Sequence, residues 1–557
     1  MSLKISTVES VPEATFNTAH AAFPKGNPCM TLRDHFGTVF SDEQFADLFP
    51  KDGQPALAPW KLALVTVLQF GENLSDRQAA ESVRARIDWK YLLGLELTDP
   101  GFDFSVLSEF RNRLINGGAE ERLLNLFVEL AKTKGLVKVR GQQRTDATHV
   151  LAAVRELNRL ELVAESMRAA LNEISTIQHE WIQEIAPTDW YKRYSRRIED
   201  TRLPKTSTKR EAYATTVGKD GFFLLDHIDK SEFAVELNEL PKVKALRIAW
   251  SRHFDQSDDA SGGGSVIFRS NTEIKESPIK IESPYDTDAR YRTKRDTSWT
   301  GYMVHLTETC DEENPHLITN IYTTPADVHD VNATPIIQQA LKDKDLLPKT
   351  HLVDSAYIDA SLLVSSKENY DIDLVGPPRE YASWQKLEGG YDTDMFTVDW
   401  ENKQVICPRE KRSTYWKEGK VKGRKNMIDV KFSPNDCRPC ENRHLCTRAK
   451  VPRRGLKIHA KEEYEARKAV SARLNTEEGK KLYNNRAGIE GTISEGIRNS
   501  GLRQARYKSL AKTHLQQVAS AVAMNFDRFV SWVSDIPRKK TRISSFKSIQ
   551  PDLAVVA

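Results

Sequence analysis

The feature that most constrains the fold is an alternation of strand-like and helical runs between residues 301 and 376. Two neighbouring strands are predicted at 301–307 and 317–322, a helix at about 333–342, a third strand at 351–354 and a fourth at 372–376. The order strand, strand, helix, strand, helix, strand is typical of a mixed α/β sheet. The sequence therefore predicts an α/β fold, a mixed sheet flanked by helices.

Length and composition indicate several globular units. The chain has 557 residues, of which 39% are hydrophobic and 29% charged. At roughly 150 residues per domain, three or four units are expected, with enough apolar material for packed cores. No run approaches the ~18 apolar residues of a membrane span, and the first residues lack a secretory apolar core. We therefore expect a cytoplasmic protein that does not enter a membrane.

Residues 1–135 are predicted to form an α-helical N-terminal domain for DNA binding or dimerisation. Ser41 and Ser75 stand where helix N-caps belong, and apolar residues recur at helical spacing. The segments 75–95 and 105–114 could form a helix-turn-helix. Its candidate DNA contacts are Arg77, Arg84, Arg86, Arg111 and Arg113. A plain solvated basic face is the alternative.

After the helical domain, the pattern predicts a further α/β unit over 136–378, which holds the mixed sheet. A short strand is expected at 136–140, followed by a helical insertion at about 150–200 that begins with a long helix at 150–183. The Ser, Asp and Gly residues of 257–265 predict a flexible linker.

Two acidic residues follow predicted strands, and a third lies far downstream. Asp146 comes after the first strand and Asp354 after a later one, and ligands gather at the carboxyl ends of strands in α/β sheets. In a helix, Tyr483, Arg486 and Glu490 would lie within about 40° of one another on one face. Gly488, Gly491 and Gly496 lie in the same segment, which indicates close backbone approach to the sheet or to DNA. Asp359 is expected to cap the helix that follows it.

These stretches resemble the DDE transposases of bacterial insertion sequences, whose catalytic core is RNase H-like. The resemblance implies that 136–378 is the first part of this core. The resemblance rests on Arg144-Thr-Asp146-Ala-Thr, Asp288-Ala-Arg-Tyr with 299–311, Val353-Asp354-Ser-Ala-Tyr357-Ile-Asp359, and Tyr483-x-x-Arg486-x-x-x-Glu490. The last motif is similar to the family's Tyr-Arg-Glu-Lys signature. Ile497 stands where the signature has its lysine, with Arg498 one place later, and Ala356 replaces a usual glycine.

The resemblance implies a transposase that binds the terminal inverted repeats of its own element and catalyses DNA cleavage and strand transfer. Asp146 would bridge two Mg²⁺ ions, for which Mn²⁺ could substitute. Asp354 and Glu490 would be the outer ligands, with Arg486 and Tyr483 as companions of Glu490. The partners would be double-stranded repeat and target DNA, with a homodimer on DNA and a location at the bacterial nucleoid. The alternatives are a metal-dependent nuclease without strand transfer and a domesticated inactive DNA-binding relative. If the motifs are fortuitous, the acids merely cap turns or lie on the surface.

The long interval between Asp354 and Glu490 predicts an inserted domain over 379–480. It carries four of the six cysteines, Cys407, Cys437, Cys440 and Cys446. Four thiolates at this spacing suit a structural, tetrahedral Zn²⁺ site. An unmetallated knuckle and a three-cysteine site completed by His444 are the alternatives. Cys29 and Cys310 stand alone and are expected to be buried.

Positive charge is concentrated in the C-terminal part of the chain. Residues 401–557 hold 35 Lys and Arg against 16 Asp and Glu, whereas residues 1–400 hold 47 against 62. This asymmetry indicates a polyanion-binding region. The predicted DNA contacts are Lys422, Arg424 and Lys425 in the insertion and Arg498, Arg503, Arg506, Lys508 and Lys512 on a helix after Glu490. The unit 481–534 would carry the catalytic and DNA-contacting helices, and 535–557 would form a basic tail.

Aromatic residues are interleaved with the basic residues of the insertion, so it could clamp DNA. In some members of the resembled family a tryptophan of the insertion holds a flipped base. Trp400 and Trp416 are the candidates here, and a core role for each is the alternative.

Overall fold

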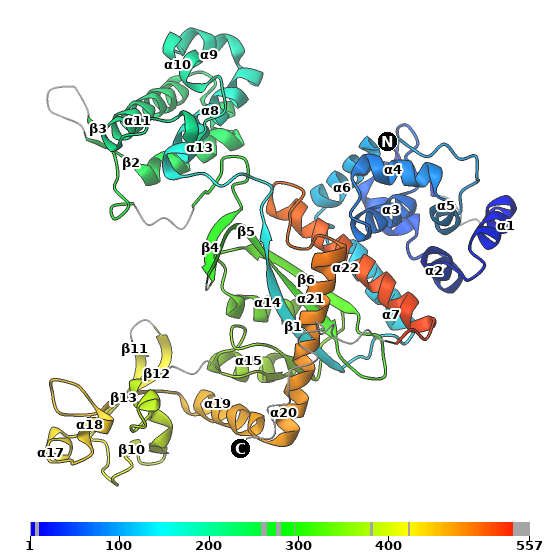
Figure 1. Ribbon diagram of the computed structural model, residues 1–557. Helices are drawn as coiled ribbons and strands as arrows, with labels where there is room; N and C mark the ends of the chain where they lie inside the picture. The colour runs from blue at the N-terminus through cyan, green and yellow to red at the C-terminus, as the bar shows by residue number, and fades with distance from the viewer. Residues whose placement is uncertain are drawn as a thin grey trace, which may run out of the picture.

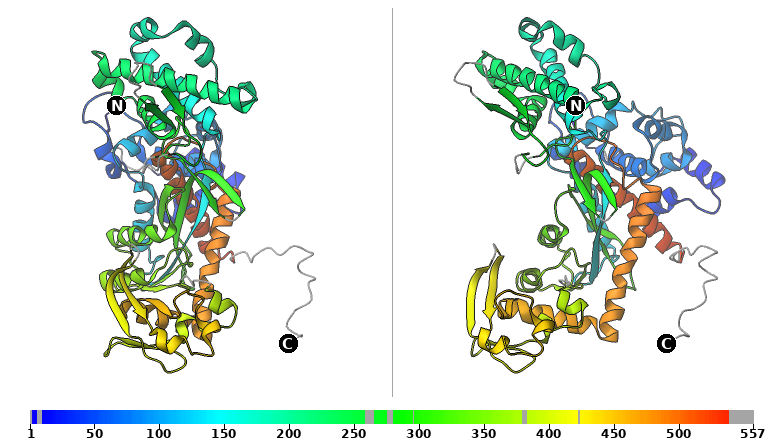
Figure 2. Two further views of the ribbon diagram at one scale, coloured as in Figure 1. Left: turned by 90° about the vertical axis from the view of Figure 1, so that its left-hand side faces the viewer. Right: turned by 60° about the vertical axis from the view of Figure 1, so that its left-hand side comes forward.

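The computed structural model describes residues 2–5, 10–257, 265–274, 280–294, 296–378, 383–421 and 424–537. Figure 1 shows a central sheet with one helical body beside it, a second helical body above it and a smaller strand-rich body below it. The further views in Figure 2 show the sheet between the upper and lower bodies. No helix among the described residues is long and apolar enough to cross a membrane.

The central sheet has six strands and mixed pairing. They are β1 (Gln142–Leu151), β4 (Arg290–Lys294), β5 (Thr297–Thr309), β6 (Ile318–Pro325), β7 (Thr350–Leu352) and β8 (Asp373–Val375). The order is β4-β5-β1-β7-β8, with β6 also paired to β5. β1 runs antiparallel to β5 and parallel to β7, and β7 runs parallel to β8. The predicted mixed α/β sheet is therefore confirmed.

Helices cover both faces of this sheet. One face carries α14 (Asp330–Asp343) and α15 (Ala360–Tyr370), and the other carries α21 (Gly488–Asn499) and α22 (Leu510–Val533), as the right-hand view of Figure 2 shows. Most residues of β5 are buried because both faces are covered. Asp359 caps α15 by accepting a hydrogen bond from the Leu362 backbone N–H at 2.8 Å, as predicted.

The N-terminal region is helical, as predicted. Its elements are α1 (Glu13–Ala22), α2 (Pro28–Phe36), the 3₁₀ helix η1 (Asp42–Leu48), α3 (Pro59–Gly71), α4 (Asp76–Ala85), α5 (Ile87–Leu93), α6 (Ser105–Asn116) and α7 (Arg122–Thr133). Ser75 caps α4, and Ser41 precedes η1. The apolar helix α3 and α7 pack on α22, which also packs on β6. The N-terminal helices and the sheet thus share one hydrophobic core.

Three local predictions around the first strand are wrong. Residues 136–140 form no strand, because the chain turns there and Arg140 adopts a left-handed φ of 59°. The strand begins at Gln142, so Asp146 lies within β1 rather than after a strand. β1 also takes residues 150 and 151 from the predicted helix, which starts at Arg159 instead.

The upper body is a helical insertion between β1 and β4, and its helices extend to His253. It contains α8 (Arg159–Ile177), α9 (His179–Ile185), α10 (Thr188–Tyr194), η2 (Asp200–Arg202), α11 (Ser207–Lys230), α12 (Ala234–Glu239), α13 (Pro241–His253), β2 (Phe254–Ser257) and β3 (Ser265–Phe268). These elements enclose a hydrophobic core of their own. Ser257 and Ser265, the ends of the predicted linker, pair across β2 and β3, and 258–264 lie outside the described residues.

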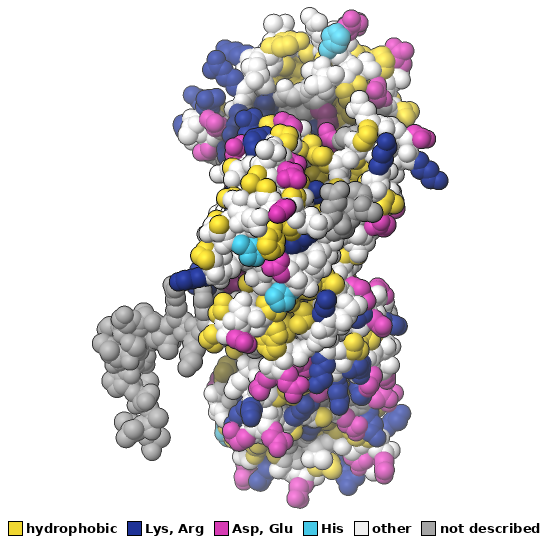
Figure 3. All heavy atoms as spheres, turned by 90° about the vertical axis from the view of Figure 1, so that its right-hand side faces the viewer, with side chains coloured by type: hydrophobic (Ala, Val, Ile, Leu, Met, Phe, Trp, Pro, Cys, Tyr) yellow, Lys and Arg dark blue, Asp and Glu magenta, His cyan; other side chains and the backbone are white. Residues whose placement is uncertain are grey.

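The lower body is the cysteine-bearing insertion. It contains α16 (Trp384–Leu387), η3 (Thr393–Met395), β9 (Thr397–Asp399), β10 (Gln404–Ile406), β11 (Tyr415–Val421), β12 (Arg424–Lys431), α17 (Pro434–Cys437), α18 (Arg443–Cys446) and β13 (Gly455–His459). The chain returns to the sheet through α19 (Lys461–Leu474), α20 (Glu477–Asn484) and η4 (Asn485–Ala487). Figure 3 shows Lys and Arg side chains interspersed with Asp and Glu over the lower part of one face.

Candidate active site

Asp146 lies in the middle of β1, on the central sheet. Its Oδ1 accepts a hydrogen bond from the Ala147 backbone N–H at 2.7 Å, and its Oδ2 pairs with Arg486 Nη1 at 2.9 Å. Burial raises the pKa of the Asp146 carboxyl, and the negative charge of Asp354 adds to this effect while Arg486 opposes it. Asp146 is therefore a partly buried carboxylate that the Arg486 guanidinium stabilises.

Asp354 is brought beside Asp146 by the strand register. In the parallel pair of β1 and β7, Arg144 stands opposite Leu352. Two positions further along each chain come Asp146 and Asp354, so the two carboxylates point from neighbouring strands at the same end of the pair. Asp354 Oδ1 accepts a hydrogen bond from the Ala356 backbone N–H at 2.8 Å, which fixes the turn after β7.

Glu490 reaches the same place from helix α21. Its side chain is 64% exposed, and its Oε1 pairs with Arg486 Nη2 at 2.8 Å. Arg486 therefore bridges Asp146 and Glu490, although 344 positions separate these acids in the chain. Burial would lower the pKa of Arg486, but Asp146, Tyr483 and Glu490 raise it, so the guanidinium stays charged.

Tyr483 completes the group of predicted residues. The Arg486 Cζ lies 6.0 Å from the centre of the Tyr483 ring. Burial raises the pKa of the half-buried phenol, which also lies within electrostatic reach of Asp354 and Asp146. The segment is not one continuous helix, as the facial arrangement assumed, because η4 separates α20 from α21. All five predicted residues nevertheless meet at one site.

This site is a pair of carboxylates on the sheet, Asp146 and Asp354, with a third, Glu490, on a covering helix, and Arg486 joins Glu490 to Asp146. Among the described residues, no group of three His, Cys, Asp or Glu side chains is arranged as a ready metal site. The donor set still fits a hard divalent cation, because carboxylate oxygens are the ligands that Mg²⁺ prefers. A cation bound there would take over the charge neutralisation that Arg486 now provides.

The sequence reasoning missed a fourth acid, Asp330, at the start of α14. Its side chain is 3% exposed, and one carboxylate oxygen has no hydrogen-bond partner. Burial raises the pKa of Asp330, Arg292 and Lys294 oppose this at 3.8 and 4.0 Å, and Asp354 raises it further. In the sequence, a single acid just before a predicted helix indicates only an N-cap. No signal in the sequence therefore marks Asp330 as a neighbour of Asp354.

The four cysteines of the insertion line one cavity, although, like the acids, they are not arranged as a ready metal site. Cys407, Cys437, Cys440 and Cys446 all line one cavity of about 30 Å³, and His444 is not among its lining residues. The Lys411 backbone N–H donates to Cys407 Sγ at 3.3 Å. Burial raises the pKa of the Cys446 thiol to about 11 in the absence of a cation, and the other three sulfurs contribute. The cavity has the size of a single small ion or water molecule. Cys29 and Cys310 are buried singly, as predicted.

The predicted DNA contacts are not on one helix after Glu490. Residues 500–509 lie outside helices, between α21 and α22. Arg503 donates to Thr148 Oγ1 at 2.8 Å, Arg506 donates to the Leu74 carbonyl at 2.6 Å, and Lys508 lies 4.9 Å from the Tyr285 ring. Arg498 and Lys512 are exposed. Lys422 lies outside the described residues, as do the side chains of Arg424 and Lys425.

The arginines of the expected helix-turn-helix make contacts within the protein. Arg111 pairs with Asp76 at 2.6 Å and Arg86 with Asp88 at 2.6 Å. Arg84 pairs with Glu81, Arg113 donates to the Leu48 carbonyl, and Arg77 lies over the Phe104 ring. Arg111 is buried by its contacts, so it helps to hold the helical body together.

Two family models match separate parts of the chain. A transposase DDE domain matches residues 406–530, from the cysteine insertion to α22, and includes Glu490. A transposase domain (DUF772) matches residues 17–113, the N-terminal helices. No curated protein matches the chain. Neither family match includes Asp146 or Asp354. The placement of these two acids in the candidate site therefore depends on the geometry of the sheet alone.

Proposed function

Because the chain is a DDE transposase, we propose that it binds the terminal inverted repeats of its own insertion sequence and catalyses DNA cleavage and strand transfer. The observation that carries the proposal is that Arg486 pairs with both Asp146 and Glu490 while Asp354 lies beside Asp146. The strand order β6-β5-β1-β7-β8, with only β5 antiparallel to both neighbours, supports an RNase H-like core. Phosphoryl transfer is the reaction that such a carboxylate set serves.

Asp146, Asp354 and Glu490 would hold two divalent cations, Mg²⁺ or Mn²⁺. When bound, the cations would activate the attacking oxygen and stabilise the leaving oxygen of the phosphodiester. Arg486 carries a positive charge beside two of the carboxylates, so it is placed to move from them to a DNA phosphate. Tyr483 packs beside the sheet and limits the movement of the Arg486 side chain.

The test is cleavage of repeat-end DNA in the presence of Mg²⁺. Asp146→Asn, Asp354→Asn and Glu490→Gln are each expected to lower the cleavage rate at least a thousandfold, with repeat binding in Ca²⁺ retained. Asp359→Asn is the matched control, because Asp359 caps α15 in the same region and Asn caps equally well. Undiminished cleavage by any of the three variants removes that residue from the site. Strand joining by the freed 3′-hydroxyl separates a transposase from a nuclease.

We further propose that the four cysteines bind a structural Zn²⁺. Their convergence on one ion-sized cavity supports this, as does the backbone N–H that points at Cys407 Sγ. Elemental analysis of the full chain is expected to give one zinc per molecule, and Cys440→Ser is expected to abolish it. Cys310→Ala, at a buried cysteine far from the cavity, should retain the zinc. Less than one equivalent in the unmodified protein contradicts the site.

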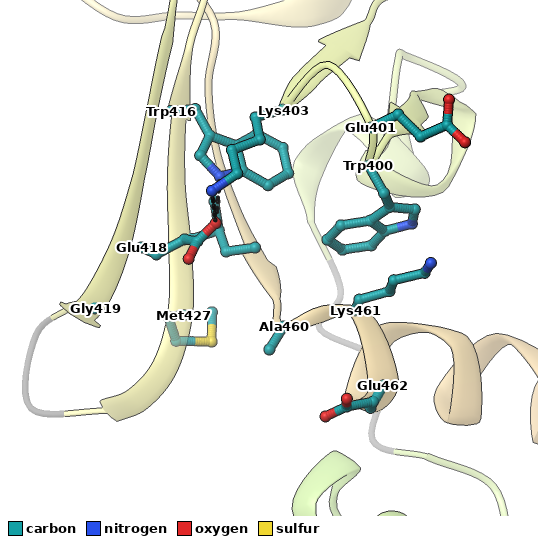
Figure 4. A pocket seen from close by; sticks show the side chains of 11 residues that line it. Trp400, Glu401, Lys403, Trp416, Glu418, Gly419, Met427, Ala460, Lys461 and Glu462 are labelled. Carbon is teal, nitrogen blue, oxygen red and sulfur yellow. Dashed lines mark hydrogen bonds and ion pairs between the residues drawn. The ribbon is translucent and has the colours of Figure 1, made fainter.

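The inserted domain would hold DNA beside the active site. A cavity of about 470 Å³ opens between β11 and the start of α19, lined by Trp400 and Trp416 from separate elements (Figure 4). The two indole rings meet edge to face with centroids 5.8 Å apart. Lys403 and Lys461 line the cavity together with Glu401, Glu418 and Glu462, and Lys403 pairs with Glu418 at 3.2 Å. The aromatic rings suit stacking with an unpaired base, and a phosphate that approached Lys403 would have to replace Glu418 as its partner.

The aromatic cavity is tested by DNA that carries one unpaired base near the cleavage position. Trp400→Ala and Trp416→Ala are expected to weaken binding of this DNA about tenfold or more relative to fully paired DNA. Trp384→Ala is the control, because Trp384 stacks on Arg448 outside the cavity. An equal loss for paired and unpaired DNA would assign both tryptophans to the core of the insertion.

The active unit would be a homodimer bound to two ends, which mass measurement of the DNA complex tests.

A further inference from the structure

A buried ion network lies beneath the helix that carries Glu490. Arg144 of β1 and Glu308 of β5 stand opposite each other in the antiparallel register. Arg144 Nε and Nη2 lie 2.7 and 2.6 Å from Glu308 Oε1, and the two side chains are 7% and 0% exposed. Arg528 of α22 joins from the other side, with Nη1 2.7 Å from Glu308 Oε2. Three elements that are distant in the chain are thereby tied together.

The remaining polar groups of the network hold the segment around Glu490. Arg144 Nη1 donates to the Asn485 carbonyl in η4. Thr492 Oγ1 of α21 donates to Glu308 Oε2 at 2.7 Å and accepts from Arg528 Nη2 at 2.7 Å. Asn485 and Thr492 lie on either side of the stretch 486–490. The network therefore bonds to the helical segment at Asn485, before Arg486, and at Thr492, after Glu490.

Gly488 permits the helix to approach Arg144 closely. A Cβ atom at Gly488 would overlap the Arg144 guanidinium, whereas a Cβ atom at Gly491 would meet no atom within 4 Å. Both glycines lower helix propensity, and only Gly488 has a steric reason in the structure. The close backbone approach expected from these glycines is therefore made to the sheet, at Gly488.

Stability alone does not explain three charged groups at this place. Buried ion pairs gain little over well-packed apolar residues of similar volume, because taking charges out of water is costly. Directional bonds, in contrast, allow only one position of the helix on the sheet. Arg144 and Asp146 are two residues apart on β1, so their side chains lie on the same face of the sheet. The hydrogen bonds and ion pairs that hold the helix are therefore made next to the carboxylates.

We propose that Arg144, oriented by Glu308 and Arg528, is a positioning residue that sets where Glu490 stands relative to Asp146 and Asp354. The inference rests on the proposed function, in which these three acids act together. Misplacing a reacting group by about 1 Å can cost a hundredfold in rate. Removing the bonds that Arg144 makes to Glu308 and to the Asn485 carbonyl should therefore lower the rate of DNA cleavage without weakening the binding of DNA.

The experiment uses the full chain with Arg144→Met, Gly488→Ala and the matched control Gly491→Ala. Two quantities are measured, amide hydrogen exchange of residues 485–495 and the kcat and KM for cleavage of repeat-end DNA in Mg²⁺. Arg144→Met and Gly488→Ala are expected to speed exchange of this segment at least tenfold and to lower kcat about a hundredfold. KM for DNA should stay within twofold, and Gly491→Ala should change neither quantity adversely.

Unchanged exchange and kcat in Arg144→Met and Gly488→Ala overturn the inference. Faster exchange across β1 and β5 as well, with kcat per folded molecule unchanged, also overturns it, because Arg144 would then only stabilise the sheet. A higher KM at constant kcat would make Arg144 a determinant of DNA binding and refute the positioning role. If the unmodified protein cleaves no DNA, the proposed function fails, and the exchange comparison alone decides whether Arg144 fixes the helix.

Discussion

Replacing Glu308 with Gln tests how much the buried ion network contributes to the sheet. The amide has nearly the same volume, so no cavity forms, but Arg144 and Arg528 lose their shared negative charge. Breaking a buried pair by removing one partner costs about 3–5 kcal/mol. Arg528 keeps a second pairing with Glu495 at 3.1 Å, so we expect the lower end, about 3 kcal/mol.

The assay is the free energy of opening of the β1 and β5 amides, from native-state hydrogen exchange. It is preferred to a global unfolding midpoint, because a chain with several cores need not unfold in one step. Glu388→Gln is the matched control. Glu388 pairs with Arg448 on the surface, where the two side chains are 52% and 60% exposed, and such pairs contribute about 0–1 kcal/mol.

The dependence of stability on pH gives a second check of the contribution of Glu308. Burial would raise the pKa of Glu308, but Arg528 and Arg144 outweigh it and hold the pKa below its ordinary value. The contribution of Glu308 is therefore present above the unfolded pKa of about 4.3 and is lost as the pH falls through the folded pKa. An opening free energy within about 1 kcal/mol of the unmodified protein, equal to that of Glu388→Gln, would refute the reasoning.

Three further predictions follow from the site and its surroundings. Burial lowers the pKa of His305 to about 3 and of His351 to about 4, so these groups stay neutral in the fold and stability should fall as the pH drops below about 6.5. The slope should be about 1.4 kcal/mol per pH unit for each histidine. His351→Gln should remove about half of the combined slope of the opening free energy of the β1 and β5 amides, measured by native-state hydrogen exchange between pH 5 and 7. Arg486→Ala should bind Mn²⁺ roughly tenfold more tightly in electron paramagnetic resonance titrations, because a positive charge leaves the carboxylates, while DNA cleavage is lost; weaker binding would contradict the bridging role. Asp359→Ala should lower the opening free energy of the α15 amides by about 1 kcal/mol through loss of the α15 cap, with cleavage retained, and an unchanged opening free energy in hydrogen exchange would show that the cap is dispensable.

Much of the candidate site could be predicted from the sequence, because its residues sit in motifs whose local spacing carries chemistry. Tyr483, Arg486 and Glu490 are close in the chain, and the facial arrangement places Arg486 beside Glu490, as their 2.8 Å ion pair shows. Cys437 and Cys440 line the same cavity for a similar local reason, because only two residues separate them. The DNA contacts were less predictable, because basic residues such as Arg506 find partners within the fold that composition does not reveal.

The sequence by itself determined the mixed sheet, the helical N-terminal region and the isolated buried cysteines, and it proposed the candidate acids, since these depend on periodicity and on residue type. Only the tertiary structure decided that Asp146 lies within β1, that Asp354 is its neighbour across a parallel pair, and that Asp330 and the Arg144–Glu308–Arg528 network stand beside them. The physical reason is that strand register and helix docking are set by the packing of residues hundreds of positions apart. A local pattern carries no information about which distant side chain will stand opposite.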